Sequence, residues 1–317
     1  MNTETAEMLC AITSDFYAKH CDSFSETRQA PWNGWKRCLG LAESLATEAG
    51  RGSGAPRGCK GEDAKVVGAG RTCAMDGPKL AGAADGARVS SGNAELRVFD
   101  LACGNMRFES YLASALPGIS FSFYTVDNCK GLLPEGVADG AVAGGQSARA
   151  IAGRLGSHAS VEHQNLDVAG CLVGGEDLGD RLHVPICDLS VSFGFMHHIP
   201  LLENRKRVLS ALIERTRSGG FVVVSFWQFM NNEAMAAKAR EVHAVALEEL
   251  GMPELDAGDF LLGWKNMPGA YRYCHSFSRA EIDGLIAGVA DKIEVAARFS
   301  ADGRTDDLNA YVVLRVR

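Results

Sequence analysis

Seven short apolar runs mark the chain from residue 96 onward and indicate buried strands. Several are near-continuous in Val, Phe, Ile and Leu, a pattern typical of strands buried on both faces of a parallel sheet. Helical periodicity lies between many of them, as in Met106–Ala115, Leu201–Thr216 and Asn232–Leu250. The runs are Leu96–Leu101, Ser120–Val126, Ser160–Gln164, Asp188–Phe193, Gly220–Phe226, Lys292–Arg298 and Ala310–Val316.

Strands that alternate with helices indicate βαβ units, and the pattern therefore predicts an α/β fold with a Rossmann-like, doubly wound sheet. The last two runs are joined by Phe299–Asn309, a polar segment with no helical pattern. Such a short connection favours antiparallel pairing. We expect a mostly parallel sheet with an antiparallel last strand.

The composition divides the chain into three regions. Residues 1–45 have helical patterning and aromatic side chains, and we expect them to form an N-terminal helical lid. Residues 46–95 are rich in Gly, Ala and Ser, so they offer too little apolar surface to offset chain entropy and are predicted to be a disordered insert. Residues 96–317 hold the alternating pattern and form the predicted α/β domain.

Charge and cysteine content narrow the class of protein. The net charge of -7 argues against a broad nucleic-acid-binding face, although a local basic groove stays open. None of the 10 cysteines forms a C-x-x-C pair, so no metal site is expected. The sequence shows neither a signal-peptide pattern nor an apolar run long enough for a membrane span, and we expect a cytoplasmic protein with reduced thiols.

The first predicted strand leads into a turn that suits a nucleoside ligand. Asp100 closes the strand, and Gly104 would let the backbone approach a ligand closely at the start of the next helix. Asp127 closes the second strand, where a carboxylate can accept hydrogen bonds from both hydroxyls of a ribose. Asp100 has a structural alternative, as a cap of the following helix.

The segment VFDLACGNMRF resembles the first motif of class I S-adenosylmethionine-dependent methyltransferases, usually written D-x-G-x-G-x-G. Ala102 and Met106 stand in place of two of its glycines. The chain also lacks a G-x-G-x-x-G match after this strand, so a dinucleotide cofactor is the weaker interpretation.

Three later segments resemble the family in the expected order. Asn165–Asp167 ends the third run, where the family often places an acid near the adenine. Cys187–Ile199 resembles the fourth motif, and Arg215–Trp227 resembles the segment around the fifth strand. The resemblance implies S-adenosylmethionine as cofactor and methyl transfer as activity.

Two flanking segments narrow the resemblance. Phe16–Trp32 contains F-S-x-T-R-x-x-P-W, and Gly269–Ser278 contains R-Y-x-H-x-F. Together with M-H-H-I they resemble the tRNA wobble-uridine carboxymethyl methyltransferases, over residues 14–45 and 96–317. The resemblance implies a carboxymethyl-uridine carboxylate in tRNA as acceptor, and a small zinc-binding activator subunit as partner.

The resemblance also assigns roles to individual residues. The structural alternatives are an ion pair with Glu26 for Arg28, core packing for Trp32 and a solvated position for Arg272. The adjacent His197 and His198 are interpreted as structural. The lid over the cofactor would consist of Tyr17, Arg28 and Trp32; the cofactor would contact Asp100, Ala102, Gly104, Asp127, Asp167 and Phe195; the acceptor would face Arg272, Tyr273 and His275.

Three functions stay open on the sequence. The first is methylation of the tRNA carboxylate, and the second is O- or N-methylation of a small molecule. The third is a non-catalytic binding module, motivated by the two altered glycines, Ala102 and Met106. The retained residues Asp100, Gly104 and Asp127 favour an enzyme over the third.

Overall fold

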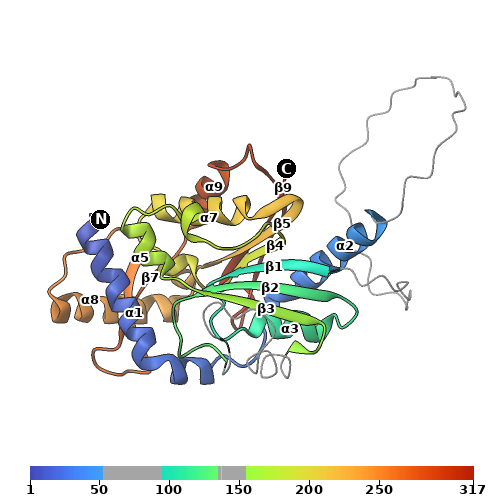
Figure 1. The fold of residues 1–317 in the computed structure, drawn as a ribbon. Coiled ribbons are helices and arrows are strands. Elements are labelled where there is room, and N and C mark those ends of the chain that lie inside the picture. Colours follow the sequence, from blue (N-terminus) through green and yellow to red (C-terminus); the bar gives the residue numbers. More distant parts are fainter. Residues whose placement is uncertain (53–94, 135–136, 138–154) are drawn as a thin grey trace, which may run out of the picture.

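The structure is a computed structural model that describes residues 1–52, 95–134, 137 and 155–317 (Figure 1). Most of the predicted insert, residues 46–95, lies outside the described residues. Helix α2 continues to Gly52, past the predicted start of that insert. The helices are α1 (Thr3–Glu26), α2 (Lys36–Gly52), α3 (Arg107–Ala115), α5 (Val168–Val173), α6 (Leu178–Arg181), α7 (Leu202–Glu214), α8 (Glu233–Leu250) and α9 (Arg279–Ala287), with short 3-10 turns η1 (Asn33–Trp35), η2 (Met196–His198) and η3 (Phe229–Asn231).

All seven strands expected from the apolar runs are present and form one sheet in the order β3-β2-β1-β4-β5-β9-β8. β1 to β5 pair in parallel, and β9 pairs antiparallel with both β5 and β8. The predicted Rossmann-like, doubly wound fold with an antiparallel last strand is therefore confirmed. The strands are β1 (Glu95–Leu101), β2 (Ser120–Asp127), β3 (Ala159–Asn165), β4 (Cys187–Ser192), β5 (Thr216–Trp227), β8 (Ile293–Ala301) and β9 (Asn309–Val316).

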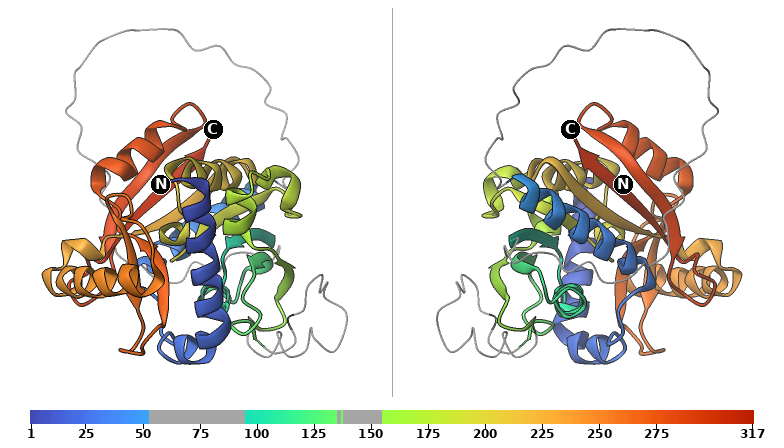
Figure 2. Two further views of the ribbon diagram at one scale, coloured as in Figure 1. Left: turned by 90° about the vertical axis from the view of Figure 1, so that its left-hand side faces the viewer. Right: turned by 90° about the vertical axis from the view of Figure 1, so that its right-hand side faces the viewer.

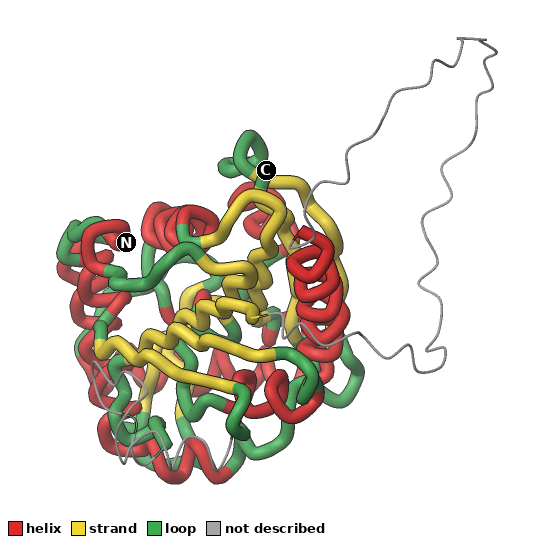
Figure 3. The backbone as a smooth tube through the Cα atoms, turned by 45° about the vertical axis from the view of Figure 1, so that its right-hand side comes forward, coloured by secondary structure: helices red, strands yellow, loops and turns green. Residues whose placement is uncertain are grey.

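Helices cover both faces of this sheet, and alternate residues of each strand enter the two layers. In β1, Leu96 and Val98 pack with α2 and α3, whereas Phe99 and Leu101 pack with α5, α7 and α9. Figure 3 shows the sheet running between helices on its two sides. This double coverage explains why the strands have near-continuous apolar sequences.

A second, two-stranded sheet was not predicted from the sequence. β6 (Asp259–Gly263) and β7 (Tyr271–His275) pair antiparallel and pack with α8 and α1. Their short sequences include Asp259, Arg272 and His275, which mask the apolar signal of a buried strand. The hairpin forms one wall of the cavity described below.

Helix α1 lies over the carboxyl ends of the parallel strands, the position expected for the predicted lid (Figure 2). The Thr13 hydroxyl accepts a hydrogen bond from the backbone N–H of Tyr273 at 3.0 Å, which joins α1 to β7. The chain then passes through Trp32 and η1 into α2. Among the described residues, no helix is both long and apolar enough to cross a membrane.

Candidate active site

The carboxyl ends of β1, β2 and β4 open into a cavity of about 790 Å³ that α1 and the segment after it close from above. In open parallel sheets, ligands bind at this edge, where the strand order reverses. Here the reversal lies between β1 and β4. The cavity is lined by ten of the residues that were predicted to form the site: Tyr17, Arg28, Trp32, Asp100, Ala102, Gly104, Asp127, Asp167, Phe195 and Arg272.

The turn after β1 is held by the acid at the end of β2. The Gly104 N–H donates to one carboxylate oxygen of Asp127 at 2.9 Å, and the Cys129 N–H donates to the other at 2.8 Å. Burial raises the pKa of the Asp127 carboxyl, and these N–H groups act in the opposite direction. The two oxygens of a carboxylate can accept about four hydrogen bonds, so the N–H groups of Gly104, Cys129 and Asn128 leave acceptor capacity for a ligand hydroxyl.

Two residues that replace glycines in this turn adopt glycine-like backbone conformations. Ala102 has φ 69° and Met106 has φ 56°, both in the left-handed region. The loop therefore keeps the conformation expected of the glycine-rich motif despite the substitutions. Gly104, at φ 55°, has open space where a side chain would start.

Ala102→Gly is expected to raise the free energy of unfolding by about 1 kcal/mol. An alanine in the left-handed conformation destabilises the folded state by about 1–2 kcal/mol, and glycine would remove this strain. Part of the gain is lost because glycine has more conformational entropy in the unfolded chain. Urea denaturation measures the change. The same substitution in a helix, Ala237→Gly in α8, should lower stability by about 1 kcal/mol. If Ala102→Gly is less stable than the unaltered protein, the backbone at Ala102 is not strained.

Asp100 does not cap the helix that follows it. The N-cap of α3 is Met106, and no side chain caps this helix. Asp100 is only 3% exposed and instead lies beside Glu109 of α3, which is completely buried. Glu109 was not singled out in the sequence, although its spacing from Leu112 and Ala113 places an acid on the buried face of α3.

Asp167 combines two roles. It lines the cavity at the end of β3, and its carboxylate caps α5 by accepting from the Gly170 N–H at 3.0 Å. Trp32 likewise lines the cavity while stacking on Trp35, with ring centroids 5.5 Å apart. Trp32 therefore has the packing contact that was its structural alternative and also lines the cavity, and Asp167 both caps a helix and lines the cavity.

The structure brings Arg28 and Arg272 to one wall of the cavity. Both guanidinium groups lie over the rings of Phe24 and Trp264, at 3.6 and 5.6 Å for Arg28 and at 6.0 and 5.4 Å for Arg272. Arg272 is 6% exposed, and its Nη1 has no hydrogen-bond partner. Among the described residues, neither arginine forms an ion pair with an acid, Glu26 included.

Burial, together with the positive charges of Arg272 and Arg107, lowers the pKa of Arg28 to about 10. Arg28 is half-buried and Arg272 is buried, and neither has an acidic partner among the described residues. Two neighbouring cations in this position are costly, and an anion between them would relieve that cost. Trp264, in the loop between β6 and β7, was missed in the sequence because a single Trp in a loop carries no pattern.

Tyr273 and His275, which were expected to face the acceptor, do not line the cavity. Successive residues of a strand point to opposite faces, so Arg272 faces the cavity while Tyr273 and His275 face away from it. Their side chains bind Asp259 at 2.7 and 2.6 Å in a buried network around Arg205. We therefore withdraw their acceptor-facing role and assign them to the structure of the hairpin.

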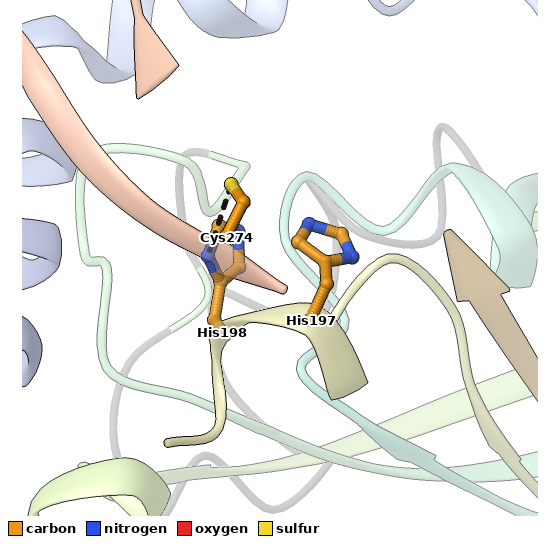
Figure 4. A group of neighbouring side chains, drawn as sticks. All are labelled: His197, His198 and Cys274. Carbon is orange, nitrogen blue, oxygen red and sulfur yellow. Dashed lines mark hydrogen bonds between the residues drawn. The ribbon is translucent and has the colours of Figure 1, made fainter. Parts of the chain in front are cut away.

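His197, His198 and Cys274 form a buried cluster at the same wall, with one potential metal-ligand atom of each within 4.8 Å of the others (Figure 4). His198 Nδ1 lies 2.7 Å from the carbonyl oxygen of Tyr273 and must donate to it, so Nε2 accepts from the Tyr17 hydroxyl at 2.9 Å. Burial and then the charge of Arg272 lower the pKa of His198 to about 3.

Both ring nitrogens of His198 are thus engaged, and the positive charge of Arg272 acts on the Cys274 thiol. A neighbouring guanidinium repels a metal cation. We assign no metal to this cluster. Because the Tyr17 hydroxyl donates its proton to His198, the Tyr17 oxygen keeps its lone pairs for a ligand in the cavity.

Comparisons with solved structures place this fold beside distant methyltransferases. A SAM-dependent methyltransferase from Methanosarcina mazei has 14% identity over 70% of this chain and 92% of its own, with a TM-score of 0.48. One from Clostridium acetobutylicum has 11% identity over 70% and 84%, with a TM-score of 0.39. The N-methyltransferase NodS from Bradyrhizobium japonicum, solved with S-adenosyl-L-homocysteine, has 10% identity over 70% and 78%, with a TM-score of 0.37.

No protein-family model and no curated protein matches the sequence. The assignment of the fold depends on the strand order, and the function on the geometry of the cavity.

Proposed function

We propose that the protein is an S-adenosylmethionine-dependent methyltransferase. The observation that carries the proposal is the bond between Asp127 and the turn at Gly104, 2.9 Å long, at the edge where the sheet reverses its order. This hydrogen bond holds the Asp127 carboxylate beside a turn with open space at Gly104, and this arrangement supports the binding of a ribose there.

The acids around this turn fit a cationic ligand and disfavour a pyrophosphate. Asp100, Asp127 and Asp167 line the same cavity, with Glu109 behind Asp100. Three carboxylates would repel a phosphate, whereas they attract a sulfonium and an ammonium group. The residues that would hold the cofactor are therefore the acids of the turn and of β2 and β3, under the lid residues Tyr17 and Trp32.

When bound, S-adenosylmethionine would supply an electrophilic methyl group, and the acceptor would displace S-adenosylhomocysteine from it in line. The chain contributes orientation and the exclusion of water more than acid–base groups. Trp32 and Tyr17 cover the cavity, and Arg28 and Arg272 fix the acceptor. A carboxylate acceptor has no proton to lose, so no base is needed.

We further propose an acceptor that carries a carboxylate, because Arg28 and Arg272 form a cationic wall that has no acidic partner in the part of the chain that the structure describes. The guanidinium group matches two carboxylate oxygens in a bidentate arrangement. The resemblance of the flanking segments favours the carboxymethyl group of wobble uridine in tRNA, with a small zinc-binding activator subunit as partner and a cytoplasmic location. A small molecule with a carboxylate is the second candidate acceptor. The two arginines would recognise the carboxylate group and not the rest of the acceptor.

Two measurements test these proposals separately. Calorimetry with S-adenosylmethionine should show binding, and no binding at about millimolar cofactor would reject the methyltransferase in favour of a non-catalytic module.

For the acceptor, tRNA from a strain lacking the gene should lose a nucleoside methyl ester and accumulate the free acid, as seen by mass spectrometry of digested nucleosides. Complementation with Arg272→Ala should leave the ester absent, and complementation with the unaltered gene should restore it. An unchanged nucleoside profile in the deletion strain would transfer the proposal to a small-molecule acceptor.

A further inference from the structure

Two cysteines lie where helix α1 meets the loop after β2. Cys21 is in α1, one helical turn after the lid residue Tyr17, and Cys129 follows Asp127 by two residues. Both are half-buried free thiols, and Cys129 lines the cavity. The pair therefore connects the lid to the segment that carries the acid proposed to bind the ribose.

Each cysteine contacts the backbone next to the other. The Cys129 thiol donates a weak hydrogen bond to the carbonyl oxygen of Tyr17, with the sulfur 3.8 Å away. In an α-helix this carbonyl also accepts from the N–H four residues later, which is that of Cys21. In the opposite direction, the Cys21 sulfur occupies the space above Gly131, where the Cβ atom of a larger residue would overlap it. These reciprocal contacts bring the two sulfur atoms into one gap between α1 and the loop.

The surroundings keep one of the two sulfur atoms protonated. Burial, followed by the negative charge of Asp127, raises the pKa of Cys129 to about 11. A thiolate at Cys21 would raise it further, because two negative charges in one gap repel each other. Since the thiolate is the nucleophile, Cys21 is the sulfur that reacts first, and Cys129 is positioned to react with the product.

We propose that Cys21 and Cys129 are a site of covalent modification, at which a hydroperoxide converts the two thiols into a disulfide bond. The Cys21 thiolate attacks an oxygen of the hydroperoxide, the oxygen–oxygen bond breaks, and water or an alcohol leaves. Cys129 then attacks the sulfur of the resulting sulfenic acid, the sulfur–sulfur bond forms, and water carries away the thiol proton. The two thiols lose two electrons and the hydroperoxide gains them.

The disulfide bond would tie α1 to the loop that carries Asp127. Tyr17 of the lid would then be fixed over the cavity, so that a bound cofactor is retained and a free one is excluded. Disulfides of proteins in a reducing compartment are usually transient and redox-sensing, and this bond would act in that way. The effect on the cofactor rests on the proposed function, whereas formation of the bond does not.

Mass spectrometry of the full-length protein tests the bond. Trypsin should release Cys21 in the peptide 20–28 and Cys129 in the peptide 108–130, each with one cysteine, so a peptide that links them identifies the bond. After treatment with hydrogen peroxide and blocking of the remaining thiols, the unaltered protein should give this linked peptide, and dithiothreitol should remove it. Cys10→Ser, which changes a half-buried thiol of the same cavity, should keep the link. If both cysteines are recovered as blocked thiols, or linked to other cysteines, the proposal is wrong.

A second measurement tests the effect of the bond on the cavity. When S-adenosylhomocysteine is bound before the treatment, it should dissociate about tenfold more slowly from the oxidised protein than from the reduced protein, because the lid cannot open. Cys21→Ser is the matched control, and its dissociation rate should be the same before and after the treatment. Equal rates for the linked and the reduced unaltered protein would overturn the closing role of the bond. Failure of the reduced protein to bind S-adenosylhomocysteine would instead reject the proposed function, and the linked peptide would still establish the bond.

Discussion

Asp127→Ala is expected to weaken binding of S-adenosylmethionine by about 100-fold or more. Each hydrogen bond from a ribose hydroxyl to a carboxylate contributes about 1.5–3 kcal/mol, and about 3 kcal/mol in total corresponds to two orders of magnitude in Kd. The substitution also removes the acceptor of the Gly104 N–H, so the turn itself loses its anchor. Titration calorimetry measures the change.

A second acid provides the control for this experiment. Asp291 lies exposed in the turn before β8, and Asp291→Ala should leave the affinity unchanged. Thermal melts of both variants establish that each is folded. If folded Asp127→Ala binds S-adenosylmethionine with unaltered affinity, the ribose does not bind at the end of β2. The proposed function would then lose the observation that supports it.

Arg205→Ala should cost about 3–5 kcal/mol of stability, because it removes the cation from a buried network. Arg205 of α7 is 4% exposed and donates to the Ile199 carbonyl at 2.9 Å, to Asp259 at 3.3 Å and to the Tyr273 hydroxyl at 2.8 Å. Without it, the carboxylate of Asp259 stays buried and loses its nearest permanent positive charge.

Urea denaturation gives the magnitude, and the neighbouring Lys206→Ala serves as comparison. The Lys206 side chain is 43% exposed and, among the described residues, forms its ion pair with Glu203 one turn away, so its loss should change stability by less than about 0.5 kcal/mol. A similarly small effect for Arg205→Ala would show that the network does not join the β6–β7 hairpin to the main sheet.

The sequence predicted the main sheet well because its central strands β4 and β5 are largely buried between helices and contain apolar runs, as does β9. The same criterion failed for β6 and β7, whose residues Asp259, Arg272 and His275 make ion pairs and hydrogen bonds inside the protein. Helix α9 was also missed, although Ser278 and Glu281 form a capping box that is visible as S-x-x-E.

The cofactor end of the site was predictable because its residues follow directly after strands. Asp100 and Asp127 end adjacent parallel strands, so their proximity follows from topology. The pairing of Arg28 with Arg272 was not predictable, since it depends on how α1 crosses a hairpin formed about 240 residues later in the chain. The orientation of Tyr273 and His275 failed for a related reason, because a motif does not say which face of a strand is buried.

The hydrogen bond between Thr13 and Tyr273 joins residues that are 260 positions apart in the chain. Helix α1 can therefore reach its final packing only after Tyr273 has been synthesised. A ribosome adding about 5–20 residues per second needs roughly 10–50 seconds to produce Tyr273 after Thr13. During that time the aromatic side of α1, with Phe16, Tyr17 and Phe24, has no hairpin to dock on. The aromatic side chains of the nascent helix therefore stay without their folded partners until the β6–β7 hairpin has been synthesised.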